Sequence, residues 1–177
     1  KMANSTNYAH NLRSNFSTTT SYLTNNAGFD VEYGKKESGV FTRYNEYANH
    51  DNRLSWGISG NSSSPLSIGI YDPAQGQNGE FVQAITSDRL LFHPETTKAS
   101  VMRFTAKVEG TVIFAIDSKR AGRADNPYAN PPITGLKNAT RILKNGVELQ
   151  KVVQTTIGQV NTMSQQFSVL VGELFGV

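Results

Sequence analysis

The stretch from Arg89 to Ile116 most constrains the fold, because it holds two runs with strand periodicity on either side of a glycine. Met102, Phe104 and Ala106 alternate with mostly polar residues, so one face of the first run is apolar. Beyond Gly110 the same period of two continues. Glycine adopts a positive φ at little cost, which favours a turn there. We therefore expect a hairpin whose apolar face needs a second sheet to cover it, as in a β-sandwich.

Short alternating runs separated by turn residues recur along the rest of the chain. Asn145 and Gly146 lie between two apolar runs and predict a type I′ hairpin turn. No repeat and no long amphipathic helix is visible. The sequence predicts an all-β protein, an antiparallel β-sandwich of jelly-roll type. Besides the two central runs, the predicted strands are Phe29–Tyr33, Val40–Tyr44, Arg53–Ser59, Leu66–Tyr71, Phe81–Ile85, Ala139–Lys144, Val147–Gln154 and Phe167–Val171.

The remaining segments divide the chain into an arm and a body. Residues 1–28 are polar and rich in Asn, Ser and Thr, which predicts an N-terminal arm or linker with one short strand near Thr18–Leu23. Residues 29–177 form the predicted β-sandwich module. Loops or turns are expected at Asn45–Asn52, at Thr155–Gln165 and, over the longest irregular piece, at Lys119–Lys137, with a short tail at Glu173–Val177.

Composition excludes several classes of protein. The 177 residues carry a net charge of +3 and no cysteine, so disulfides and thiolate metal sites are excluded. No basic stripe alternates with aromatic residues, which argues against nucleic-acid binding. No apolar run approaches the length of a membrane span. Only 18% of the residues are charged, and small polar residues abound, which suits a secreted or cell-surface domain.

Catalytic and metal-binding patterns are weak. There is no Gly-x-Ser-x-Gly segment, and nothing selects a catalytic pair among the 14 scattered acidic residues, so we expect a module that is not an enzyme and has no cofactor. Calcium is the one metal that the oxygen-rich pairs Asp51-Asn52 and Asp125-Asn126 could hold. His93 is expected to be tied to backbone groups, with contact to a ligand as the alternative.

Aromatic side chains beside predicted loops are the strongest candidates for binding. Sugar rings stack on Trp and Tyr, while Arg, Asp and Asn bind their hydroxyl groups. Two alternatives stay open: a single tryptophan in a strand is usually part of the core, and Tyr128 is equally an exposed residue without a ligand. The candidate ligand-binding residues are Tyr44, Tyr47, Trp56, Tyr71, Arg123, Asp125, Asn126 and Tyr128.

The order of several short motifs resembles a family of bacterial extracellular β-sandwich modules found beside glycoside hydrolases and polysaccharide lyases. The resemblance covers about residues 29–177. It implies a non-catalytic module that binds carbohydrate or a cell-surface glycan. The matching motifs are Phe29–Tyr33, Phe41-Thr42, Arg53 to Trp56, His93-Pro94, Arg103 to Val112 and Ile142 to Gly146.

The chain departs from that family at its C-terminal end. The family continues after the strand matching Phe167–Val171 with a Gly-Asp turn and a final apolar strand, which we expect here to be missing or supplied by another chain. A sheet edge left without that strand would expose unpaired backbone groups. This leaves a second hypothesis, in which the protein is a structural subunit of a surface filament, and identical neighbours donate a strand, for example from residues 1–28.

Overall fold

The computed structural model describes residues 9–26, 28–50, 53–61, 66–70, 82–83, 88–123, 128, 130–132 and 134–177, without the side chains of residues 25–26, 50, 53, 82–83 and 122–123. These residues form strands and no helix, and the paired strands are antiparallel. The expected all-β class is therefore confirmed.

Strands cover most of the described chain. In chain order they are β1 Tyr22–Asn26, β2 Phe29–Glu37, β3 Val40–Arg43, β4 Glu46–His50, β5 Arg53–Gly57, β6 Ser67–Ile70, β7 Val82–Gln83, β8 Leu90–His93, β9 Lys98–Ala106, β10 Gly110–Lys119, β11 Gly122–Arg123, β12 Asn138–Lys144, β13 Val147–Gln154, β14 Val160–Val169 and β15 Leu174–Gly176.

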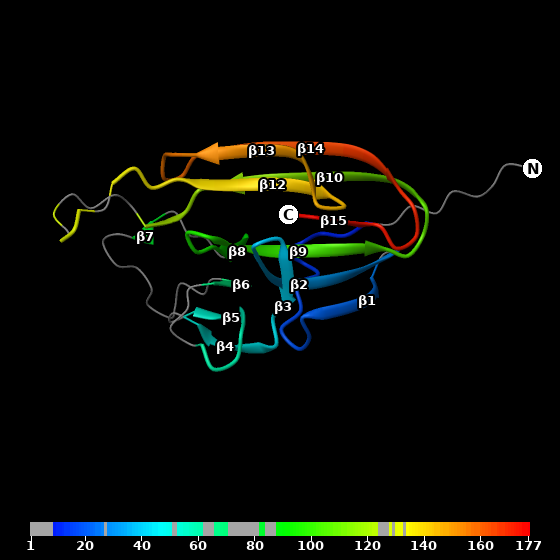
Figure 1. Cartoon of the computed structure of the whole chain (residues 1–177), viewed down its shortest axis with the longest axis horizontal. Helices are drawn as coiled ribbons and strands as arrows, with labels where there is room; N and C mark the ends of the chain where they lie inside the picture. Colours follow the sequence, from blue (N-terminus) through cyan, green and yellow to red (C-terminus); the bar gives the residue numbers. More distant parts are fainter. Residues whose placement is uncertain are drawn as a thin grey trace, which may run out of the picture.

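The largest sheet has the order β1-β2-β9-β15-β12-β13, with β3 paired to β2. A second sheet has the order β4-β5-β6-β8, and β10 pairs with β14 over ten register positions. In Figure 1, β10, β12, β13 and β14 lie along one long side of the molecule, β4, β5 and β6 along the other, and β9 and β15 between them. The strand β9 is thus central to the fold.

The expected hairpin across Gly110 is wrong. The strands before and after this glycine do not pair, since β9 pairs with β2 and β15 whereas β10 pairs with β14. The chain crosses from one sheet to the other at this turn. Phe104 and Phe114 then face each other, with ring centroids 5.6 Å apart. Alternation predicted both apolar faces correctly, but these faces pack against each other rather than lying side by side.

The hairpin expected at Asn145-Gly146 is confirmed, whereas three segments expected to be a loop, a turn and a tail contain strands. Asn145 and Gly146 have positive φ values of 49° and 79°, as a type I′ turn between β12 and β13 requires. The polar segment expected to be a loop contains β4, and the second expected turn region contains the first half of β14. The expected tail forms β15, which pairs with β9 on one side and β12 on the other. In the first two segments, backbone pairing overrides the polar composition.

The arm has a packing role that its sequence does not reveal. The segment pairs through β1 with β2, and Leu12 and Phe16 pack against the core. Phe16 stacks on Tyr33 with 5.0 Å between ring centroids, and the indole N–H of Trp56 donates a hydrogen bond to the Ser17 carbonyl oxygen at 2.6 Å. Residues 9–26 therefore lie on the body of the same chain.

Phe175 on β15 joins the sheets through aromatic contacts. Its ring stacks on Phe104 at 5.2 Å and meets Phe167 edge-on at 5.5 Å. It also contacts Phe29 at 5.9 Å and Phe114 at 6.0 Å, so rings from five strands meet at one point. The Phe175 side chain is almost completely buried, with 4% of its surface exposed.

We predict that Phe175→Ala lowers the free energy of unfolding by about 3–5 kcal/mol, because it leaves a cavity where four rings meet. The matched control is Ile113→Ala, since Ile113 is 70% exposed. The control should cost less than about 1 kcal/mol. Urea unfolding measures both values, and equal losses would contradict the central role of Phe175.

Candidate functional site

Tyr44 is a core residue and offers no ring face to a ligand from solvent. None of its surface is exposed, and its hydroxyl group lies 2.8 Å from the Ser100 hydroxyl. The Ser100 hydroxyl in turn lies 2.7 Å from the His93 carbonyl oxygen. Tyr44 can thus donate to Ser100, and Ser100 to a carbonyl. The prediction of Tyr44 as a ligand contact is corrected here, because burial and this hydrogen-bond chain assign it to the core.

Trp56 and Tyr47 lie together at the edge of the core. Trp56 is 6% exposed, which agrees with the core alternative for a single tryptophan. The half-buried Tyr47 packs against it with ring centroids 5.4 Å apart. Burial raises the pKa of Tyr47. His93 is also half-buried, and its Nδ1 lies 3.0 Å from the Pro94 carbonyl oxygen, as expected for a histidine tied to the backbone.

The remaining predicted residues come from the long loop and its neighbourhood. Tyr128 is 95% exposed. Arg123 belongs to β11, which pairs with β7, and its side chain is outside the described residues. Tyr71, Asp125 and Asn126 also lie outside them, as does the pair Asp51-Asn52. Within the described ranges, no group of three or more His, Asp or Glu side chains could hold a metal ion.

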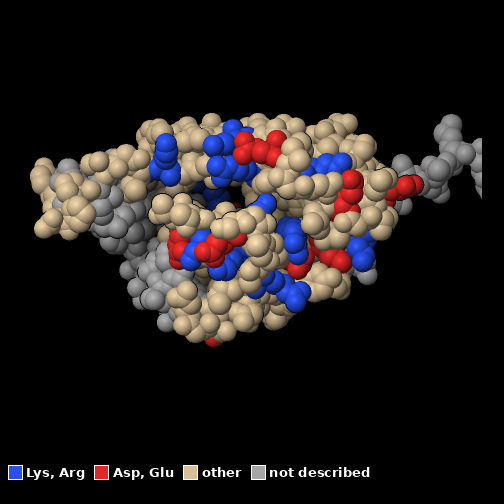
Figure 2. All heavy atoms as spheres, in the orientation of Figure 1, with Lys and Arg blue, Asp and Glu red and all other residues tan. Residues whose placement is uncertain are grey.

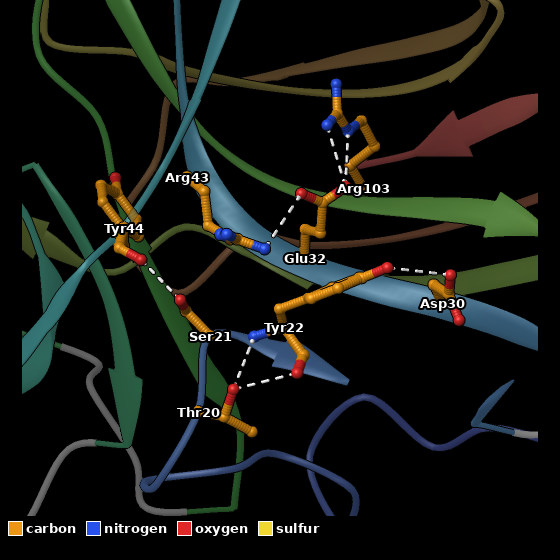
Figure 3. Close-up of polar contacts among 8 residues, drawn as sticks. All are labelled: Thr20, Ser21, Tyr22, Asp30, Glu32, Arg43, Tyr44 and Arg103. Atoms are coloured by element: carbon orange, nitrogen blue, oxygen red, sulfur yellow. Dashed lines mark hydrogen bonds and ion pairs between the residues drawn. The ribbon is translucent and has the colours of Figure 1, made fainter. Parts of the chain in front are cut away.

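A polar cluster covers the outer face of β2 beside β1, β3 and β9 (Figure 3). Glu32 accepts two hydrogen bonds from Arg103, at 2.9 and 3.2 Å, and lies 3.9 Å from Arg43. Tyr22 donates a hydrogen bond to Asp30 at 3.1 Å. The guanidinium of Arg103 covers the Phe41 ring at 3.7 Å. These groups satisfy one another, so the cluster stabilises the sheet and leaves little for a ligand.

An open strand position lies beside this cluster, in the same sheet. The strand β15 enters between β9 and β12, but it pairs with β12 only at Leu143 and Lys144. Val177 then exchanges two backbone hydrogen bonds with Met102, at 2.8 and 3.1 Å. Beyond this point β9 extends to Lys98 and β12 to Asn138, and no described strand lies between them.

A cleft of about 750 Å³ occupies this position (Figure 2). A strand residue fills about 160 Å³, from a rise of about 3.3 Å, a strand spacing of about 4.8 Å and a sheet spacing of about 10 Å. The cleft therefore has room for about four or five strand residues. Its described lining comes mainly from β8, β9, β10, β12 and the arm, with Lys36 of β2 beside them. Apolar side chains contribute much of it, among them Leu12, Leu90, Phe92, Val101, Ile116 and Leu143.

Basic side chains outnumber acidic ones around the cleft. In the part of the chain that the structure describes, the half-buried Lys36 and Lys119 have no ion pair. Arg141 lies 2.8 Å from Glu148, and Arg89 donates a hydrogen bond to the Asp117 carbonyl oxygen at 2.8 Å. Figure 2 shows Lys and Arg side chains on both sides of the hollow. The cleft thus combines an apolar interior with a positively charged rim.

The site prediction missed this cleft, because its residues are scattered from the arm to the C-terminal strand. The one relevant signal was the final strand expected to be missing. The structure shows a short strand at that place, followed by an open position. The candidate site is therefore a gap between backbone edges rather than a set of aromatic side chains.

Tyr44 gives a test of the corrected assignment. Burial raises its pKa above the ordinary value of 10.0, and the Ser100 hydrogen bond only partly opposes this. A raised pKa favours the protonated form in the fold, so its contribution to stability is complete below about pH 10 and is lost as the pH rises through the folded pKa. We predict that Tyr44→Phe reduces the loss of unfolding free energy between about pH 9 and about pH 11.5, measured by urea unfolding. An unchanged pH slope would contradict the buried assignment.

No helix in the described part of the chain is long and apolar enough to cross a membrane. Comparison with family models, with curated proteins and with solved structures finds no match for this chain, so its function is argued from its own geometry.

Proposed function

We propose that this chain is a non-catalytic, secreted or cell-surface module of the jelly-roll sandwich type that takes up a β-strand from another polypeptide. The observation that carries this proposal is the open strand position between β9 and β12. It develops the filament hypothesis, in which neighbours in an assembly donate strands to one another.

Backbone edges supply the binding groups. Met102 of β9 exchanges backbone hydrogen bonds with Val177, and Ala106 bonds the turn before β15. Phe104, between them, lies in register with β15. Continuing this alternation, Ser100 directs its N–H and C=O groups into the open position. Two such edges face each other here, so an added strand gains ladder hydrogen bonds on both sides.

The donor is best sought outside the described part of this chain. Residues 9–26 pack on their own core, so donating them would expose Leu12 and Phe16 to solvent. Deleting the segment up to residue 25 would also remove most of β1. A segment other than the arm avoids both costs, so the arm is a less favourable donor than the filament hypothesis assumed.

We predict that a six-residue peptide of alternating valine and threonine binds by strand addition. The amide proton of Ser100, and those of Asn138–Arg141 that face the gap, should then exchange with deuterium at least about tenfold more slowly, because ladder hydrogen bonds protect them. Ala99 and Val101 are paired with β2 and should not change. Hydrogen exchange measured by mass spectrometry or NMR checks this.

The matched control is the same peptide with a methyl group on every second backbone nitrogen. It keeps the side chains but loses ladder donors, so it should bind much more weakly. Equal binding of the two peptides would contradict strand addition.

Glycan binding remains a second candidate function, and the 95% exposed Tyr128 ring favours it. A ring so exposed can stack on a sugar. This second proposal keeps polysaccharide as the partner that the sequence suggests. Tyr44 no longer counts among its binding residues, because it belongs to the core.

We predict that, if this candidate is right, Tyr128→Ala weakens retardation of the protein in polysaccharide affinity gels by about fivefold or more, as loss of a stacking ring does. Tyr128→Phe keeps the ring and should bind like the unchanged protein. Absence of retardation on plant, bacterial and host polysaccharides would leave strand addition as the remaining proposal.

A further inference from the structure

We infer that the cleft takes an acidic peptide strand, which runs antiparallel to both β9 and β12, with apolar side chains on its inner face and carboxylates on its outer face. This inference rests on the proposed function and adds the chemistry of the partner.

Register defines the direction and the two faces of the added strand. The added strand continues the line of β15, which is antiparallel to both β9 and β12. Phe175 points into the aromatic core, so alternate positions of the added strand point inward as well. These positions meet the apolar interior of the cleft, which includes Leu90, Phe92 and Ile116. Apolar side chains are therefore required at every second residue.

The outer positions meet basic side chains on both sides of the gap, from β12 on one side and from β2, which lies beyond β9, on the other. Lys36 stands opposite Ala99 in the register of β2 and β9, and both residues line the cleft. On the other side, Arg141 is exposed and neighbours the fully buried Ile142, so the two side chains lie on opposite faces of β12. Lys36 and Arg141 thus flank the outer face of the added strand, and Lys119 also lines the cleft.

The acidic residues of the cleft do not balance this charge. Asp117 accepts a hydrogen bond from Thr162 at 2.8 Å, and its carboxylate is engaged there. Arg141 has an acidic partner in Glu148, but Lys36 and Lys119 have no ion pair within the described ranges. A half-buried ammonium group loses part of its hydration, so an added carboxylate beside it is favoured.

The depth of the cleft and the backbone groups along its two strand edges favour a peptide over other anions. A phosphate or an acidic sugar could neutralise the lysines, but neither supplies the alternating N–H and C=O groups that two strand edges require. The apolar interior also needs side chains that fill it. A peptide with alternating apolar and acidic residues meets all three requirements.

The test uses three fluorescent six-residue peptides with valine at alternate positions and glutamate, glutamine or lysine between them. Fluorescence anisotropy should show the glutamate peptide binding at least about fivefold more tightly than the glutamine peptide, and the lysine peptide binding most weakly. Raising the salt concentration from about 0.05 M to about 0.5 M should remove most of this difference, because screening weakens exposed ion pairs.

Charge variants of the protein locate the effect. Lys36→Gln should weaken binding of the glutamate peptide about two- to fivefold, as expected for a partly exposed ion pair. It should leave binding of the glutamine peptide unchanged. Lys36→Glu should reverse the preference towards the lysine peptide. Lys107→Gln is the matched control, since Lys107 follows the other end of β9 and pairs with Asp30 at 3.5 Å. It should not change the order of the three peptides.

The outcomes separate this inference from the proposed function. Equal binding of the glutamate and glutamine peptides, with slowed exchange at β9 and β12, would overturn the acidic partner and leave strand addition standing. No binding of any peptide would overturn both. Slow exchange of the Ser100 amide proton before any peptide is added would also overturn both, because the protein itself would fill the position. Protection that grows with protein concentration would make a second copy the occupant and overturn the acidic partner.

Discussion

The packing of Phe175 against four other aromatic rings is the contact on which the rest of the structure depends. It places a three-residue strand, β15, between β9 and β12 and joins the largest sheet to β10 and β14. A Cβ atom at Gly176 would collide with the Met102 carbonyl oxygen, so glycine allows β15 to approach β9 this closely. Beyond this short strand, no strand in the described part of the chain lies between β9 and β12.

A buried polar network holds the far wall of the cleft in place. The Gln154 side chain is 1% exposed, and its amide donates to the Ser118 carbonyl oxygen at 2.7 Å. Ser118 also lies 2.7 Å from the Thr140 hydroxyl, which links β10 to β12. Arg120, 4% exposed, donates to the Thr155 carbonyl oxygen. Buried polar groups with partners fix geometry well, so this wall can stay open without a strand in the gap.

Strand uptake and glycan binding use different parts of the molecule. The cleft offers backbone groups, an apolar interior and basic side chains, whereas Tyr128 offers a single exposed ring on a loop. Of the predicted aromatic residues with described side chains, Tyr44 and Trp56 belong to the core instead. The geometry therefore gives strand uptake more support, and the two proposals can be tested independently.

The sequence by itself determined the all-β class, the apolar faces around Phe104 and Phe114, and the Asn145-Gly146 hairpin, because alternation and turn chemistry are local properties. It did not determine which strands pair. Only the tertiary structure placed the strands on either side of Gly110 in different sheets, buried Tyr44, and packed Phe16 of the polar arm on Tyr33. The cleft also belongs to the tertiary structure, since its edges come from strands about forty residues apart in the sequence. Pairing of this kind is decided by non-local packing, which no local pattern records.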